Sequence, residues 1–176
     1  MFKKFVDSIA KICTCNKSST IIFDEIKNIL GSNETEFFNK MINDEIKQNF
    51  SRDKLTQIVR NGSIYHKYNL YNSDLFDIVD IKWEKNSMSK PHDHPALGCI
   101  VLMYNNGKIQ EYNLVRNSDG KIVFTGTKYM ENGDIGYKIG NKNLHLINAR
   151  KYSETVHVYV PGKHVTSYYD ENIKIH

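Results

Sequence analysis

The sequence predicts a jelly-roll-like, all-β barrel preceded by an N-terminal helical segment. Two changes of pattern along the chain support this prediction. In the first third, apolar residues such as Phe23, Ile26 and Leu30 recur at helical spacing, and Gly31 follows as a helix stop. From about Leu75 the apolar period changes to two, and turn motifs separate short strand-like stretches at near-regular spacing. Many short strands of this kind are typical of a sandwich or a barrel.

Three more helices are expected before the barrel. The opening segment, Met1 to Cys15, has apolar residues at helical spacing and lacks the unbroken apolar core of a signal peptide. Asn33 and Glu36 have the spacing of a capping box, which predicts a helix start. A short helix is expected from Leu55 to Val59, with Asn61-Gly62 ending it.

The clearest strand ends at Trp83. Val79, Ile81 and Trp83 alternate with Asp80 and Lys82, as in a half-buried strand with one apolar and one polar face. Turn motifs rich in Asn and Gly come after this strand. They are Asn105-Asn106-Gly107, Asn117-Ser118-Asp119-Gly120 and Glu131-Asn132-Gly133-Asp134.

Length and composition limit the possible functions. A chain of 176 residues has room for one domain, so we expect residues 1–62 to form a helical cap packed on a barrel of residues 63–176. The net charge of +4 is spread along the chain, without the basic stripe of a nucleic-acid-binding protein. Three cysteines cannot all pair internally, which favours a reducing, cytoplasmic compartment. The longest apolar run, Cys99 to Tyr104, is too short to cross a membrane. We therefore expect a soluble monomer.

Three histidines are candidate metal ligands. His92 and His94 are two residues apart, so on a strand they point to the same face. His145 follows the later turns. Neutral imidazole suits Fe, Zn, Cu or Ni, so the histidines alone do not choose the metal.

The order of these residues resembles the two motifs of the cupin superfamily. An HxH pair is followed by a turn glycine, Gly107, and then by a lone histidine after a second turn region. The resemblance implies a cupin barrel with the three histidines facing its interior. Cupins commonly add a glutamate ligand a few residues after the pair, and here Cys99 occupies that position. We therefore expect three neutral imidazoles and no carboxylate beside them.

A cysteine in place of this glutamate is similar to the cysteine dioxygenases, and so is Thr155-Val156-His157-Val158-Tyr159, which matches their Ser-x-His-x-Tyr. The resemblance covers roughly residues 60 to 161. It implies that Cys99 and Tyr159 form a thioether cross-link, with His157 and Thr155 orienting the Tyr159 hydroxyl. It also implies Fe(II) on the histidines and oxidation of L-cysteine by O2 to cysteine sulfinic acid.

The substrate-binding residues depart from that family. Its Tyr-x-Arg pattern, which holds the substrate carboxylate, corresponds here to Tyr65-His66-Lys67. A lysine ammonium cannot reproduce the two-pronged guanidinium, and an alignment shifted by one residue replaces Lys67 with Tyr68.

Other interpretations therefore remain open. One is a dioxygenase of another small thiol, such as 2-aminoethanethiol, 3-mercaptopropionate or an N-terminal cysteine. Another is a non-catalytic metal-binding cupin. In the structural interpretation of single residues, Cys99 is a small buried apolar group, Tyr159 a barrel-lining aromatic and Lys67 an exposed strand residue.

Overall fold

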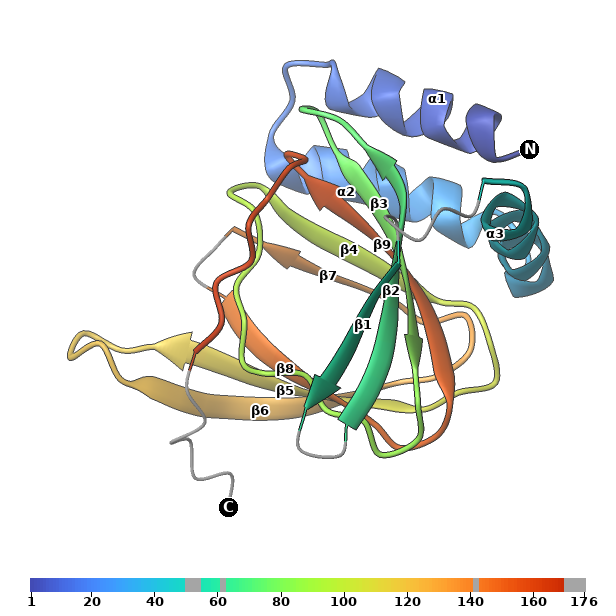
Figure 1. The fold of residues 1–176 in the computed structure, drawn as a ribbon. Coiled ribbons are helices and arrows are strands. Elements are labelled where there is room, and N and C mark those ends of the chain that lie inside the picture. The colour runs from blue at the N-terminus through green and yellow to red at the C-terminus, as the bar shows by residue number, and fades with distance from the viewer. Residues whose placement is uncertain (50–54, 61–62, 141–142, 170–176) are drawn as a thin grey trace.

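The computed structural model describes residues 1–49, 55–60, 63–140 and 143–169. Within these ranges, two antiparallel sheets form the barrel (Figure 1). The six-stranded sheet has the order β1-β2-β3-β9-β4-β7, and the three-stranded sheet has the order β6-β5-β8. The strands are β1 Leu55–Arg60, β2 Ser63–Asn72, β3 Asp77–Trp83, β4 Gly98–Met103, β5 Ile109–Arg116, β6 Ile122–Met130, β7 Ile135–Ile139, β8 Asn143–Ala149 and β9 Ser153–Val160. The predicted all-β barrel with an N-terminal helical segment is confirmed.

Three helices cover the outer face of the six-stranded sheet (Figure 1). They are α1 Phe2–Cys13, α2 Ser19–Gly31 and α3 Thr35–Asn49. Their apolar sides share one buried cluster with outward-facing strand residues such as Ile100 and Val158. A second cluster, which includes Val79 and Ile81, fills the barrel interior. Because apolar layers lie on both faces of this sheet, its strands lose a simple alternation of buried and exposed residues.

Strand β3 shows this effect. Asp80 and Lys82 lie on the helix-covered face, and Asp80 is fully buried, so the expectation of a half-buried strand is wrong for this sheet. The Tyr104 hydroxyl donates a hydrogen bond to Asp80 at 2.6 Å, and Lys82 donates to Asn43 of α3 at 3.1 Å. The second carboxylate oxygen of Asp80 is buried without a hydrogen-bond partner among the described residues.

Two local predictions are wrong. Leu55 to Val59 belong to strand β1, which pairs with β2 along its whole length, and not to a helix. The third helix begins at Thr35, and the Asn33 side chain donates to the Ile29 carbonyl at 3.1 Å, at the end of the preceding helix. A side chain engaged there does not form the predicted capping box.

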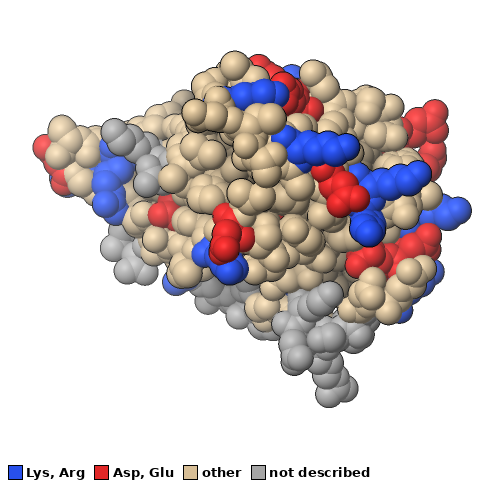
Figure 2. Space-filling model, turned by 90° about the horizontal axis from the view of Figure 1, so that it is seen from above, with Lys and Arg blue, Asp and Glu red and all other residues tan. Residues whose placement is uncertain are grey.

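The helical face of the molecule shows no large area of one charge. In Figure 2, which views this side, basic and acidic side chains are interspersed. None of the helices in the described ranges is both long and apolar enough to span a membrane.

Candidate metal centre

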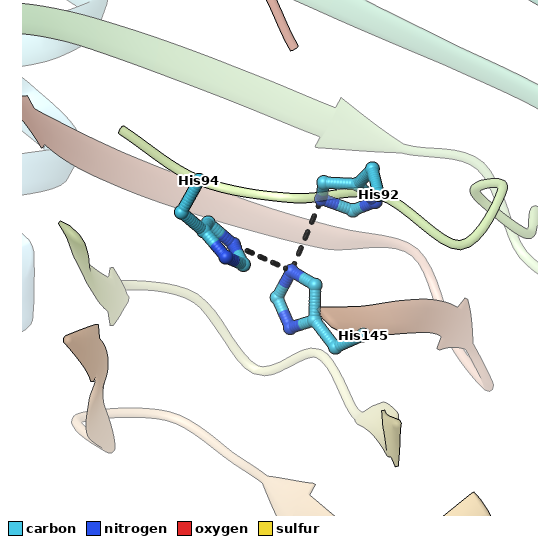
Figure 3. A group of neighbouring side chains, drawn as sticks. All are labelled: His92, His94 and His145. Carbon is cyan, nitrogen blue, oxygen red and sulfur yellow. Dashed lines mark hydrogen bonds between the residues drawn. The ribbon is translucent and has the colours of Figure 1, made fainter. Parts of the chain in front are cut away.

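The three predicted histidines converge on one point in the barrel (Figure 3). His92 and His94 lie in an extended segment ahead of β4, not in a strand as expected, while His145 lies in β8. Backbone hydrogen bonds in both directions, at 3.0 and 3.2 Å, hold His92 beside His145. The Nε2 atom of His145 is 3.0 Å from Nε2 of His92 and 3.0 Å from Nε2 of His94.

The hydrogen-bond partners of Nδ1 show which ring nitrogen of His92 and of His94 carries the proton. Nδ1 of His92 faces the Lys90 carbonyl at 2.8 Å, and Nδ1 of His94 faces the Asn143 carbonyl at 3.1 Å. A carbonyl only accepts hydrogen bonds, so each Nδ1 must carry the hydrogen. Burial and the neighbouring histidines lower the pKa of His92 well below its usual range and that of His94 to about 2. Both rings are therefore neutral, with the Nε2 lone pair turned inward.

Lone pairs that meet at 3.0 Å without a proton between them repel one another, unless a cation lies between them. Metal–nitrogen bonds of about 2.1 Å at right angles would separate two such nitrogens by about 3.0 Å. The donor set, its tautomers and its spacing therefore fit a divalent metal ion. The arrangement fits a single ion held by three histidines, and it does not by itself choose the metal.

The third ring is oriented by a carboxylate that the sequence analysis missed. Glu111 of β5 accepts a hydrogen bond from Nδ1 of His145 at 2.5 Å and pairs with the Lys138 ammonium at 2.9 Å. Burial alone would raise the pKa of Glu111, but the contacts with His145 and Lys138 outweigh burial and lower it to about 2. The expectation of no carboxylate beside the histidines is therefore wrong, although Glu111 faces Nδ1 and not the metal-facing nitrogen. The available signal in the sequence was that Glu111 lies two residues after the apolar Ile109, so the two side chains share the barrel-facing side of β5.

Cys99 and Tyr159 are direct neighbours across the β4–β9 pair. Both backbones point these side chains into the barrel, where the Cys99 sulfur lies 3.8 Å from Nδ1 of His157. Burial raises the pKa of the Cys99 thiol and that of the Tyr159 phenol. Gly98 makes this register possible, because a Cβ at this position, where φ is +136°, would lie 1.9 Å from the Lys138 carbonyl oxygen of β7.

A chain of hydrogen bonds along β9 leads to the Tyr159 hydroxyl. The Thr155 hydroxyl accepts from Trp83 Nε1 at 2.9 Å and donates to the Ile81 carbonyl at 3.4 Å. Its second lone pair is left for the Nε2–H of His157, which is 2.9 Å away. Nδ1 of His157 then accepts from the Tyr159 hydroxyl at 3.4 Å. Burial and the nearby Lys67 charge lower the pKa of His157 to about 3, in agreement with a neutral ring.

Strand β2 places Tyr65 and Lys67 on its barrel-facing side. Tyr65 stacks on Trp83, with ring centroids 4.6 Å apart. Tyr68 lies on the opposite face and packs against the helix-side cluster. Lys67, and not Tyr68, is therefore the residue that faces the histidines. The interpretation of Lys67 as an exposed residue is wrong, since it is half-buried.

Two adjoining spaces meet at Lys67 and Tyr159. A space of about 20 Å³ next to His92 is lined by both residues. A larger, polar cavity of about 320 Å³ is also lined by both, together with Asn72 and Asp77. Lys67 and Tyr159 are the residues that the two spaces share. Every predicted site residue thus lies in one region of the barrel.

Comparisons with known proteins support the fold. No family model and no curated protein matches the sequence. An uncharacterized conserved protein with a double-stranded β-helix domain from Klebsiella pneumoniae subsp. pneumoniae MGH 78578 has a TM-score of 0.50 at 14% identity, covering 69% of this chain and 96% of that one. The chain has the cupin fold, a double-stranded β-helix.

Two other solved structures are similar at lower TM-scores. KdgF from Halomonas sp. matches at TM-score 0.47 and 16% identity, covering 65% of this chain and 94% of that one. Oxalate decarboxylase from Lactobacillus farciminis matches at TM-score 0.48 and 16% identity, covering 68% of this chain and 35% of that one. The matched part of this chain thus spans about a third of the length of the decarboxylase.

Proposed function

We propose that this cupin is a thiol dioxygenase, which uses Fe(II) and O2 to oxidise L-cysteine to cysteine sulfinic acid. The observation that favours this function most is the pairing of Cys99 with Tyr159 beside three inward-facing histidines. A plain metal-binding cupin needs neither residue. In this proposal both atoms of O2 are added to the substrate sulfur, so the reaction balances without another reductant.

The protein groups have separate tasks in the proposed reaction. His92, His94 and His145 would hold Fe(II), which supplies the redox chemistry with O2. The hydrogen-bond chain from Thr155 through His157 would fix the Tyr159 hydroxyl near the reacting atoms. Fixing a group in place before the reaction lowers the entropy that the reaction must lose.

A thioether between Cys99 and Tyr159 would hold the Tyr159 ring more firmly. The two residues are cross-strand partners, so the bond requires no change of register. Lys67 would hold the substrate carboxylate, and Tyr65, stacked on Trp83, would form the wall beside it. The burial of His94 and His145 inside the barrel would limit side reactions of the thiol.

Measurement of O2 consumption by the iron-loaded protein tests this function. L-cysteine, 2-aminoethanethiol and 3-mercaptopropionate are compared, with His145→Ala as the control that lacks one ligand. We expect one O2 consumed for each cysteine sulfinic acid formed, and no reaction by the control. Preference for another thiol would instead make this a dioxygenase of that thiol. Stoichiometric iron without oxidation of any thiol would indicate a non-catalytic metal-binding cupin.

A further inference from the structure

The chain returns to the metal centre after its last strand. Beyond β9, the Gly162 amide donates to the Asp74 carbonyl at 3.3 Å, and the Lys163 amide donates to the Asp77 carboxylate at 2.7 Å. The segment from residue 163 to 169 then runs down one side of the barrel (Figure 1), and Tyr168 within it lines the small space beside His92. It therefore forms part of the wall between solvent and the histidines.

Asp93, which lies between the two paired histidines, holds this segment in place. The Ser167 amide donates to the Asp93 carboxylate at 2.8 Å, and the Asp93 amide donates to the Ser167 carbonyl at 3.2 Å. The Tyr169 amide donates to the Pro91 carbonyl at 2.9 Å. These bonds fix the residue between them, Tyr168, directly opposite His92.

Tyr168 consequently contributes to the space beside the histidines. Its ring centroid is 6.0 Å from that of His92, and it lines the same small space as Lys67 and Tyr159. Within the described part of the chain, neither the Tyr168 hydroxyl nor the Lys67 ammonium has a hydrogen-bond or ion-pair partner. Tyr168 is 45% exposed, and an ammonium and a phenol donor that line one space favour an anionic ligand there.

The chemistry of the two donors is complementary. An ammonium is a point charge and lacks the parallel donors with which an arginine holds both oxygens of a carboxylate. A phenol O–H supplies one neutral donor with a fixed direction. Lys67 and Tyr168 together therefore offer the charge and the second donor that a carboxylate requires.

We propose that Tyr168 is a specificity-determining residue, which binds the substrate carboxylate together with Lys67. This inference rests on the proposed function and narrows its substrates to thiols that carry a carboxylate. A hydrogen bond to a charged group is strong enough to change affinity about tenfold. Thiols without a carboxylate, such as 2-aminoethanethiol, gain nothing from the pair.

Tyr168→Phe removes only the hydroxyl and tests this inference. Dissociation constants of L-cysteine and 2-aminoethanethiol are measured by calorimetry on the iron(II) protein without O2, and KM values are measured with O2. We expect about tenfold weaker binding and a higher KM for L-cysteine, with 2-aminoethanethiol unchanged. Tyr129→Phe, which removes an exposed hydroxyl on β6, is the matched control and should change neither ligand.

A double-mutant cycle with Lys67→Met separates shared recognition from a general effect. If both residues bind one carboxylate, their effects on L-cysteine affinity should be non-additive. Equal losses for both thiols, or no loss for L-cysteine, would overturn the role of Tyr168. If the protein binds L-cysteine without oxidising it, the proposed function fails while the binding data still decide the inference. If it binds neither thiol, both fail.

Discussion

Glu111 shows how a residue that does not contact the metal can determine its binding. It orients His145 and adds a negative charge beside the three-histidine cluster. Such carboxylate–histidine pairs orient the ligand and raise its basicity. The Lys138 ammonium contacts the same carboxylate oxygen, Oε1, that accepts from His145, so Glu111 has little freedom to turn away.

Glu111→Gln should weaken metal binding about 10- to 100-fold. An amide oxygen at the Oε1 position could still accept from both His145 and Lys138, but the negative charge that strengthens both contacts would be lost. Competition with a chelator of known affinity measures the change. Glu131→Gln is the matched control, because Glu131 pairs with Lys108 at the surface and should leave metal affinity unchanged. Equal affinities for all three proteins would contradict the role of Glu111.

Asp80 predicts a pH dependence of stability. Burial is the main cause that raises its pKa to about 7, against the hydrogen bond from Tyr104 and the charge of Lys82. Between about pH 4 and pH 7, Asp80 therefore carries a proton in the folded protein, whereas in the unfolded chain, where its pKa is near 3.8, it has lost that proton. Because the folded pKa is the higher one, the free energy of unfolding falls as pH rises from about 4 to about 7, and levels off above.

Asp80→Asn should remove this part of the pH dependence. Between pH 5 and pH 8, the unmodified protein should lose about 2 to 3 kcal/mol more unfolding free energy than the variant does. Urea unfolding at both pH values measures this difference. Asp119→Asn, in an exposed turn, should follow the unmodified protein. If Asp80→Asn follows it as well, Asp80 is ionised in the folded state and its proton plays no part.

Among the helices and strands, the elements predicted correctly from the sequence are those whose structure is determined by neighbouring residues in the chain. The α2 helix, with its apolar stripe and final Gly31, and the turn glycines of the barrel agree with the structure. Strand β1 does not, because Leu55 to Arg60 become a strand only by pairing with β2. The apolar spacing of such a short segment fits a helix or a strand equally well. Pairing decides the outcome, and pairing is not a local property.

The β4–β9 pair predicts a covalent modification. Cys99 and Tyr159 are cross-strand partners, so thioether formation would require no change of register, and O2, the proposed co-substrate, would accept the two hydrogens lost from the S–H and ring C–H bonds. Intact mass of the reduced protein should show a species lighter by about two daltons, which increases with turnover. Cys99→Ser should abolish this species and retain measurable activity, since the three histidines remain. Cys13→Ser, a cysteine of α1, should retain the lighter species. A constant mass during turnover would contradict the cross-link.

For the whole molecule, the histidine triad could be predicted from the sequence, but the groups around it could not. Motif order identified His92, His94 and His145, and strand alternation linked Thr155 with Tyr159. Glu111 and Tyr168 are different, because no motif marks them. The β5–β8 register brings Glu111 to His145, and the returning C-terminal segment brings Tyr168 to His92. Only the closed barrel joins these distant segments.

This closure couples metal binding to the stability of the whole barrel. His145 belongs to the three-stranded sheet, whereas His92 and His94 lead into β4 of the six-stranded sheet. One ion would therefore connect the two sheets in the folded state, and the unfolded chain offers no such preformed site. A ligand that binds only the folded state raises the free energy of unfolding by about 2.7 kcal/mol at 100 times its dissociation constant.

Thermal unfolding with and without Fe(II), in the absence of O2, should therefore show a shift. For a chain of this size, the expected rise in Tm is roughly 5 to 10 °C at that metal excess. His145→Ala should remove most of the rise, because the two remaining rings, His92 and His94, both lie in the segment ahead of β4 and no longer connect to the three-stranded sheet. His66→Ala, which removes an imidazole outside the triad on β2, should show the full rise. A metal-induced rise that survives in His145→Ala would mean that the ion binds elsewhere in the protein.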